Sequence, residues 1–132
     1  MIDVVLNFII AGRDTTAAAL SWTMFELIGK QDNIIDKAVA SVEKETGGKQ
    51  LQELPEEEIF KVIYTKLGYI KAMLSEGLRL HPSVAKDLKY AVEDDVLPDG
   101  TKVKKGMVMF YSPYVMGRSP QLWKDPLRYA PQ

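Results

Sequence analysis

The sequence contains no cysteine, and it has a single histidine, His81, among its 132 residues. Disulfide bonds and thiolate metal sites are therefore excluded within this chain, and so is a histidine-rich metal cluster. The 17 basic and 18 acidic side chains nearly cancel, leaving a net charge of −1. Bulk charge therefore favours neither nucleic acid nor an anionic membrane surface as a partner.

Long hydrophobic runs are also scarce. The apolar run over residues 4–11 is interrupted by Asn7 and is followed at once by Arg13 and Asp14. A membrane-spanning helix needs roughly 20 apolar residues, so we expect no transmembrane segment in this chain, and its location stays open. The remaining composition, 46% hydrophobic and 27% charged, suits one globular domain over residues 1–132.

A long apolar helix is the first predicted element. Residues 4–11 are apolar almost all the way round, which is typical of a helix buried on every side. Good helix formers continue to about Lys30, which gives roughly 30 residues and a length of ~45 Å. A compact domain of this size has a diameter of only about 36 Å, so we expect a central helix from a larger domain.

Further helices are expected before Pro82. One runs from about Asp32 to Thr46, because a glycine pair follows it and glycine is common just after a helix. Another begins after Pro55, carries glutamates in its first turn, and continues as an apolar stripe until Pro82 ends it.

The pattern changes from helical to extended after Pro82. Short strands are predicted over residues 86–92, 101–103 and 107–111, with turn residues between them. The order predicts an α+β fold that is mostly α. Its parts would be a helical region (1–82), a small antiparallel β region (83–112) and an irregular tail (113–132).

The first motif that carries chemistry is Ala-Gly-Arg-Asp-Thr-Thr at residues 11–16, in the middle of the long helix. A mid-helix glycine costs about 1 kcal/mol relative to alanine, and Asp and Thr side chains compete for backbone groups. Such a local defect is typical of a functional groove or a π-bulge. A polar turn packed against another subunit explains the same residues equally well.

The second motif is Glu76-Gly77-Leu78-Arg79. Residues three apart share a helix face, so the Glu76 carboxylate and the Arg79 guanidinium can form an ion pair. An exposed pair would contribute only ~0.5 kcal/mol, whereas a buried pair needs further partners and acts as a structural anchor. The surrounding leucines favour partial burial.

Together, in this order and about 60 residues apart, the two motifs resemble those of the cytochrome P450 family. The family's central helix carries Ala or Gly, then Gly, any residue, Asp or Glu, Thr, and Thr or Ser, which residues 11–16 match throughout. A later helix carries Glu-x-x-Arg followed by Leu, one residue and Pro, as Glu76 to Pro82 does. The Lys105-Gly106 and Met116-Gly117-Arg118 stretches and the terminal Tyr129-Ala130-Pro131 also resemble family elements.

The resemblance implies a partial cytochrome P450 fold, a haem cofactor and roles for the matching residues. Ala11 and Gly12 would lie beside the haem and leave room for dioxygen. Thr15 would hold water or the bound oxygen by a hydrogen bond, and Asp14 would help to relay protons to it. Lys89 would face a haem propionate, supplying charge without the two-point fork of an arginine.

Other residues would shape the site without reacting. Glu76 and Arg79 would form a structural ion pair near the haem. The substrate side would be lined by Phe8 and by the turn that follows the second helix motif, namely Ser83, Val84 and Ala85. The single His81 is interpreted as a structural helix-end residue and not as a ligand.

The family binds haem iron through a cysteine thiolate, which this chain lacks, so we expect no metal ligand here and no activity from the chain alone. The parent enzyme would hydroxylate a hydrophobic substrate with O2 and electrons from an NADPH-cytochrome P450 reductase-type donor. The context looks most like the eukaryotic fatty-acid ω-hydroxylase branch, which implies a fatty-acid substrate and an endoplasmic reticulum location. The alternative is a non-catalytic remnant or a helical interaction module.

Overall fold

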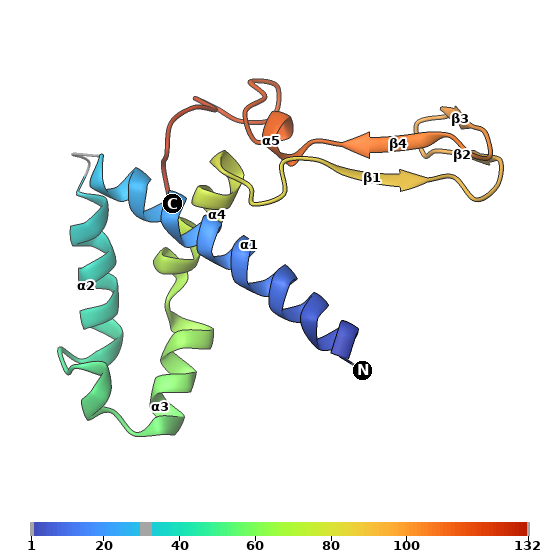
Figure 1. Ribbon diagram of the computed structural model, residues 1–132. Coiled ribbons are helices and arrows are strands. Elements are labelled where there is room, and N and C mark those ends of the chain that lie inside the picture. The colour runs from blue at the N-terminus through green and yellow to red at the C-terminus, as the bar shows by residue number, and fades with distance from the viewer. Residues whose placement is uncertain (1, 30–32, 132) are drawn as a thin grey trace.

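The computed structural model describes residues 2–29 and 33–131 (Figure 1). Helices dominate the first part of the chain, and a narrow antiparallel ribbon extends from it. The expected α+β, mostly α fold is therefore confirmed. The helical elements are α1 (Ile2–Ile28), α2 (Ile34–Thr46), a 3-10 turn (Leu51–Glu53), α3 (Glu56–Lys61), a π-helical turn (Val62–Lys66), α4 (Gly68–Leu80) and α5 (Pro113–Met116).

The ribbon consists of two antiparallel pairs. Strand β1 (Asp87–Tyr90) pairs with β4 (Val108–Tyr111), and β2 (Asp95–Val96) pairs with β3 (Lys102–Val103) at its far end (Figure 1). The register places Lys89 opposite Met109. The three predicted strands are found, each one to three residues shorter than expected, and the pair at the tip adds β2, which the sequence pattern did not indicate.

The continuous helix expected between Pro55 and Pro82 is interrupted, so the prediction is wrong for the middle of this segment. A π-helical turn replaces α-helix at Val62–Lys66, and the Leu67 backbone leaves the helical region at ψ 56° before α4 begins. The side-chain ammonium of Lys71 donates to the Tyr64 carbonyl, which the irregular turn leaves without a normal helical partner.

Residues 11–16 form regular α-helix, so the π-bulge considered for this motif is not found there. The Thr15 hydroxyl donates to the Ala11 carbonyl at 2.6 Å, one turn earlier. A carbonyl oxygen has two lone pairs, so this bond is added to the helical ladder and does not replace a backbone bond.

Helices α1 and α4 cross at a close contact between Thr23 and Gly77. A Cβ atom on Gly77 would lie 2.3 Å from the Thr23 hydroxyl oxygen, so the crossing needs glycine at this position. The main buried cluster lies on the same face of α4 as Gly77 and contains Ile34, Ala38, Met73, Leu80 and Tyr129, with Leu27 of α1 packed against it. The C-terminal tail therefore completes the core that α2 and α4 begin.

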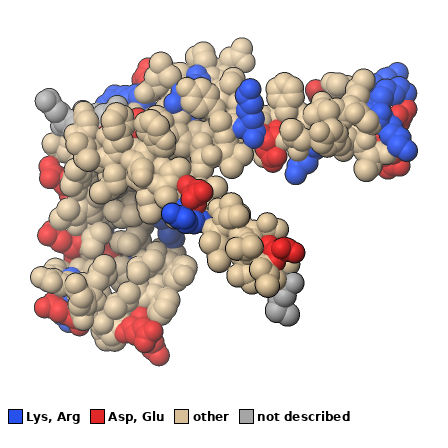
Figure 2. Space-filling model, in the orientation of Figure 1, with Lys and Arg blue, Asp and Glu red and all other residues tan. Residues whose placement is uncertain are grey.

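The N-terminal half of α1 projects away from the rest of the molecule (Figure 1). Its apolar side chains are exposed, Phe8 at 76% and Ile10 at 63%, and Thr23 is the buried residue of this helix. Burial of α1 on every side is thus wrong for this chain by itself, because α4 contacts only the C-terminal half. The projecting end carries little charge (Figure 2). Among the described helices, none is long and apolar enough to cross a bilayer.

Candidate functional site

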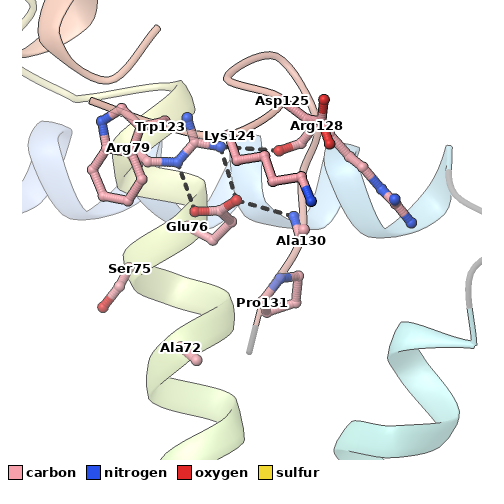
Figure 3. A pocket seen from close by; sticks show the side chains of 10 residues that line it. All are labelled: Ala72, Ser75, Glu76, Arg79, Trp123, Lys124, Asp125, Arg128, Ala130 and Pro131. Carbon is pink, nitrogen blue, oxygen red and sulfur yellow. Dashed lines mark hydrogen bonds and ion pairs between the residues drawn. The ribbon is translucent and has the colours of Figure 1, made fainter. Parts of the chain in front are cut away.

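A buried ion pair lies at the centre of the α4–tail contact. The Arg79 guanidinium donates to both carboxylate oxygens of Glu76, at 2.7 and 2.8 Å, and the side chains are only 8% and 15% exposed (Figure 3). Two parallel charge-assisted bonds fix the geometry of both side chains. The spacing of three residues on one helix places them together.

Arg79 also binds the tail that folds back over α4. It donates to the carbonyl of Gly117, to that of Pro126 at 2.7 Å and to that of Arg128 at 2.9 Å. With the two bonds to Glu76, these interactions use all five N–H donors of the guanidinium. The Trp123 ring packs against the same group, 4.9 Å from its centroid (Figure 3).

Glu76 holds the end of the tail in a similar way. The Ala130 N–H donates to its carboxylate at 3.0 Å. Burial would raise the pKa of Glu76, but the hydrogen bonds from Arg79 and Ala130, with the charge of Arg79, outweigh it and hold the pKa below its ordinary value. A carboxylate with a lowered pKa and several hydrogen-bond donors is suited to a structural anchor and not to a proton-transferring acid.

The sequence motif predicted the pair but not its other partners. The carbonyls of Gly117, Pro126 and Arg128 belong to an irregular segment whose path no periodicity predicts. The Met116-Gly117-Arg118 stretch was the one signal in the sequence, and the structure explains its glycine, since a Cβ on Gly117 would lie 2.1 Å from the Arg79 carbonyl oxygen. Tyr129, recognised only as part of a terminal element, is fully buried, and its hydroxyl donates to the Met73 carbonyl at 2.8 Å.

A second site is an apolar groove of about 530 Å³ between α1 and α4. Thr15 and Ser83, which are 68 residues apart, meet there, and the Ser83 hydroxyl donates to the Thr15 carbonyl at 2.7 Å. Val84 lies on the same wall. The lining consists of Thr15, Thr16, Ala19, Leu20, Leu74, Leu78, Pro82, Ser83, Val84 and Pro113.

Thr15 has one hydroxyl hydrogen, and the Ala11 carbonyl accepts it. The hydroxyl oxygen therefore faces any molecule in the groove as a hydrogen-bond acceptor. Phe8 and Gly12 lie on the same helical strip as Thr15, at intervals of three and four residues, and both are exposed. A Cβ on Gly12 would meet no atom within 4 Å.

The remaining predicted residues are not brought into this groove. Asp14 lies roughly 100° round the helix from Thr15, is 77% exposed, and has Arg13 as its ion-pair partner at 3.8 Å. Lys89 is exposed on β1, in the ribbon. Ala85 is exposed as well, and its carbonyl accepts a hydrogen bond from the Ser112 hydroxyl at 2.9 Å. The roles expected for these residues stay predictions.

His81 follows the last residue of α4 and joins that end to α1. Its Nε2 lies 2.7 Å from a Glu26 carboxylate oxygen, and its ring stacks on Trp22 with centroids 4.3 Å apart. These contacts are structural. Within residues 2–29 and 33–131, no group of three or more His, Asp or Glu side chains is placed to hold a metal ion.

The comparisons with known proteins agree on one family. A sequence model described as cytochrome P450 matches residues 1–132. Cytochrome P450 94A1 of Vicia sativa is 42% identical, over 93% of this chain and 22% of its own length. Cytochrome P450 86B1 of Arabidopsis thaliana is 40% identical over 98% of this chain and 24% of its own length, so the chain spans less than a quarter of either relative.

Solved structures show the same fold at lower identity. A cytochrome P450 crystal structure (CYP102L1) matches with a TM-score of 0.76 and 22% identity, covering 96% of this chain and 27% of that one. A zebra fish cytochrome P450 with progesterone matches with a TM-score of 0.77 and 21% identity, covering 95% and 28%. With the two motifs on crossing helices and a family match over its whole length, the chain belongs to the cytochrome P450 family.

Proposed function

We propose that this chain forms the distal wall and the structural anchor of a haem-thiolate monooxygenase that hydroxylates a hydrophobic substrate. The observation that carries the proposal is the groove in which Thr15 of the central helix meets Ser83 and Val84 of the turn after α4. Their proximity supports the proposal, because Thr15 is the residue proposed to handle oxygen and the turn is proposed to lie on the substrate side.

The groove fits one face of a haem but not its iron. Leu74, Leu78 and Pro113 give it an apolar wall suited to a flat, largely apolar ring, and Thr15 adds a single hydroxyl. The chain contains no cysteine, so an axial thiolate would have to come from outside these 132 residues. When bound, a thiolate-ligated haem supplies the chemistry that cleaves the O–O bond of dioxygen.

The chain's own residues would prepare that chemistry. Ala11 and Gly12, which lack bulky side chains, would leave room beside the ring. The Thr15 oxygen would accept a hydrogen bond from water or another donor in the groove. Asp14, exposed to solvent, would carry protons toward the groove. Lys89 would reach a haem propionate.

The proposed substrate is a fatty acid, and the proposed electron donor is an NADPH-cytochrome P450 reductase-type protein. The apolar groove and the exposed Phe8 support a hydrophobic substrate. The resemblance of the motifs and their context to the fatty-acid ω-hydroxylase branch supports the choice of a fatty acid. The same resemblance supports the endoplasmic reticulum as the location of the parent enzyme.

The test is a chimera in which residues 1–132 replace the matching segment of cytochrome P450 94A1 of Vicia sativa. We expect it to incorporate haem, to give the carbon monoxide difference band of a thiolate-ligated haem, and to hydroxylate fatty acids with a reductase. A matched Thr15→Ala chimera should keep the band and lose most of the product. A folded, haem-loaded chimera that forms no product would refute the proposal.

The chain alone is proposed to be inactive. Mixed with haem, the 132-residue chain should not give the carbon monoxide difference band of a thiolate-ligated haem, because it offers no thiolate. Observation of that band would contradict this part of the proposal.

A second candidate is a non-catalytic helical interaction module, and the exposed apolar half of α1 favours it. Sequencing the transcript on both sides of the coding region discriminates the two functions. A continuous frame encoding a cysteine-containing loop after Gln132 supports the enzyme, whereas a stop codon there supports the module.

A further inference from the structure

We propose that Ser83 is a positioning residue that acts through Thr15, and not a substrate contact as the sequence suggested. This inference rests on the proposed function for the role of Thr15. Its basis is the hydrogen bond from the Ser83 hydroxyl to the Thr15 carbonyl, 2.7 Å long and partly buried.

The bond occupies the one hydrogen of the Ser83 hydroxyl, so this group cannot donate to a substrate while the bond is formed. A serine hydroxyl has one donor, and here the Thr15 carbonyl accepts it. Val84, next along the chain, is 53% exposed and offers an apolar side chain to the groove. Val84 is thus the better suited of the two to contact a hydrophobic substrate, while Ser83 connects the turn to the central helix.

The position of this bond along α1 makes it important for holding the Ala11–Thr16 motif. The specific contacts of α1 with Gly77 and His81, made by Trp22, Thr23 and Glu26, lie about two turns or more C-terminal to Thr15. Within the described residues, no hydrogen bond joins α1 to another element on the N-terminal side of Thr15. Ser83 is thus the polar contact that holds the Ala11–Thr16 motif against the turn after α4.

Thr15 is held on both sides as a result. Its hydroxyl donates to the Ala11 carbonyl, and its carbonyl accepts from Ser83. These two bonds restrain the Thr15 hydroxyl and backbone relative to the turn that carries Val84. Positioning of this kind affects where oxygen and substrate meet, and a small displacement lowers the yield of a reaction without weakening substrate binding.

The bond itself can be observed in the 132-residue chain. Thr15-Thr16 is the single Thr-Thr pair of the sequence. Threonine labelled with ¹³C at the carbonyl and with ¹⁵N therefore gives one correlated NMR signal, from the Thr15 carbonyl and the Thr16 nitrogen. If the chain self-associates, the same signal can be recorded by magic-angle-spinning solid-state NMR.

Ser83→Ala should move this carbonyl signal in the direction that loss of a hydrogen bond produces, and Ser83→Thr should restore it. Ser21→Ala, which removes an exposed hydroxyl from the same helix, should leave the signal in place. An unchanged signal in Ser83→Ala would overturn the proposal, whatever the activity of any enzyme that contains this segment.

The functional consequence is measured in the haem-loaded chimera. Ser83→Ala should lower the product formed per NADPH consumed by about five-fold, the factor expected for loss of one neutral hydrogen bond, with KM unchanged. Ser83→Thr should recover the yield. On a Thr15→Ala background, Ser83→Ala should add no further loss, because it acts through that threonine.

A raised KM with an unchanged yield would identify Ser83 as a substrate contact and overturn the positioning role. Additive losses in the double variant would overturn it too. A chimera in which Thr15→Ala has no effect would refute the proposed function instead, while the carbonyl signal would still decide whether the bond exists.

Discussion

Tyr129 donates its hydroxyl to the Met73 carbonyl at 2.8 Å and so ties the C-terminal tail to α4 across 56 residues. Its side chain is fully buried in the cluster that α2 and α4 share. One residue thus joins the irregular tail to the helical core, and the ion pair of Glu76 and Arg79 lies one turn further along the same helix.

The buried phenol predicts loss of stability in alkali. Burial, with a contribution from the Glu76 charge, raises the pKa of Tyr129 to about 12 from an ordinary value of 10.0. The unfolded chain ionises this phenol first, so the stabilisation is complete below pH 10 and is lost as the pH rises to about 12. Urea unfolding between these pH values should show a fall of about 2 kcal/mol.

Tyr129→Phe is the matched variant for that measurement. It should abolish the alkaline component, and at neutral pH it should cost about 1–3 kcal/mol because the Met73 carbonyl loses its donor. An alkaline fall of the same size in Tyr129→Phe would show that other groups cause it.

Glu76 predicts the opposite pH dependence. Its pKa is held below the ordinary value of 4.5, so its stabilising effect is present above that pH and is lost as the pH falls through the lowered value. Glu76→Gln should lower the free energy of unfolding at neutral pH and flatten the profile below pH 4.5. A variant profile parallel to that of the unchanged chain would contradict this assignment.

Arg79→Lys should destabilise the chain by about 3 kcal/mol in chemical denaturation, although the charge is kept. An ammonium cannot reproduce the two-point bond to Glu76 together with bonds to three tail carbonyls, and buried acceptors would lose their donors. The control is Arg13→Lys, since Arg13 is 82% exposed beside Asp14, and its change should stay below about 0.5 kcal/mol. Equal losses of stability from Arg79→Lys and Arg13→Lys would refute the anchoring role of Arg79.

Gly77→Ala should push α1 away from α4. The new methyl would lie 2.3 Å from the Thr23 hydroxyl oxygen, so we expect a loss of about 1–3 kcal/mol, partly recovered by Thr23→Ala. Gly68→Ala, on the same helix with no atom within 4 Å of its new methyl, should not destabilise. Thermal or urea unfolding of Gly77→Ala, of the double variant with Thr23→Ala, and of Gly68→Ala provides the comparison.

The exposed half of α1 predicts self-association of the isolated chain. Sedimentation velocity should show species larger than a monomer, and Ile10→Lys should reduce them by placing charge in the apolar stretch. Ile28→Lys, at an exposed residue of the other end of α1, is the control and should have little effect. A monomer with a sharp thermal transition would contradict the prediction.

The sequence by itself determined most of the helices and strands and the two motifs. Local signals were sufficient for α1, for the glycine stop of α2 and for the end of the α4 segment at Pro82, because capping and periodicity act over a few residues. The Glu76–Arg79 pair was equally predictable, since residues three apart share a helix face.

Only the tertiary structure decided which distant groups meet. No local pattern places the Ser83 hydroxyl on the Thr15 carbonyl or the Gly117, Pro126 and Arg128 carbonyls around Arg79. The π-helical turn at Val62–Lys66 also escaped prediction, because its stretch of sequence retains ordinary helical spacing. Such contacts depend on how helices cross and where an irregular tail returns, and these are set by packing between residues far apart in the chain.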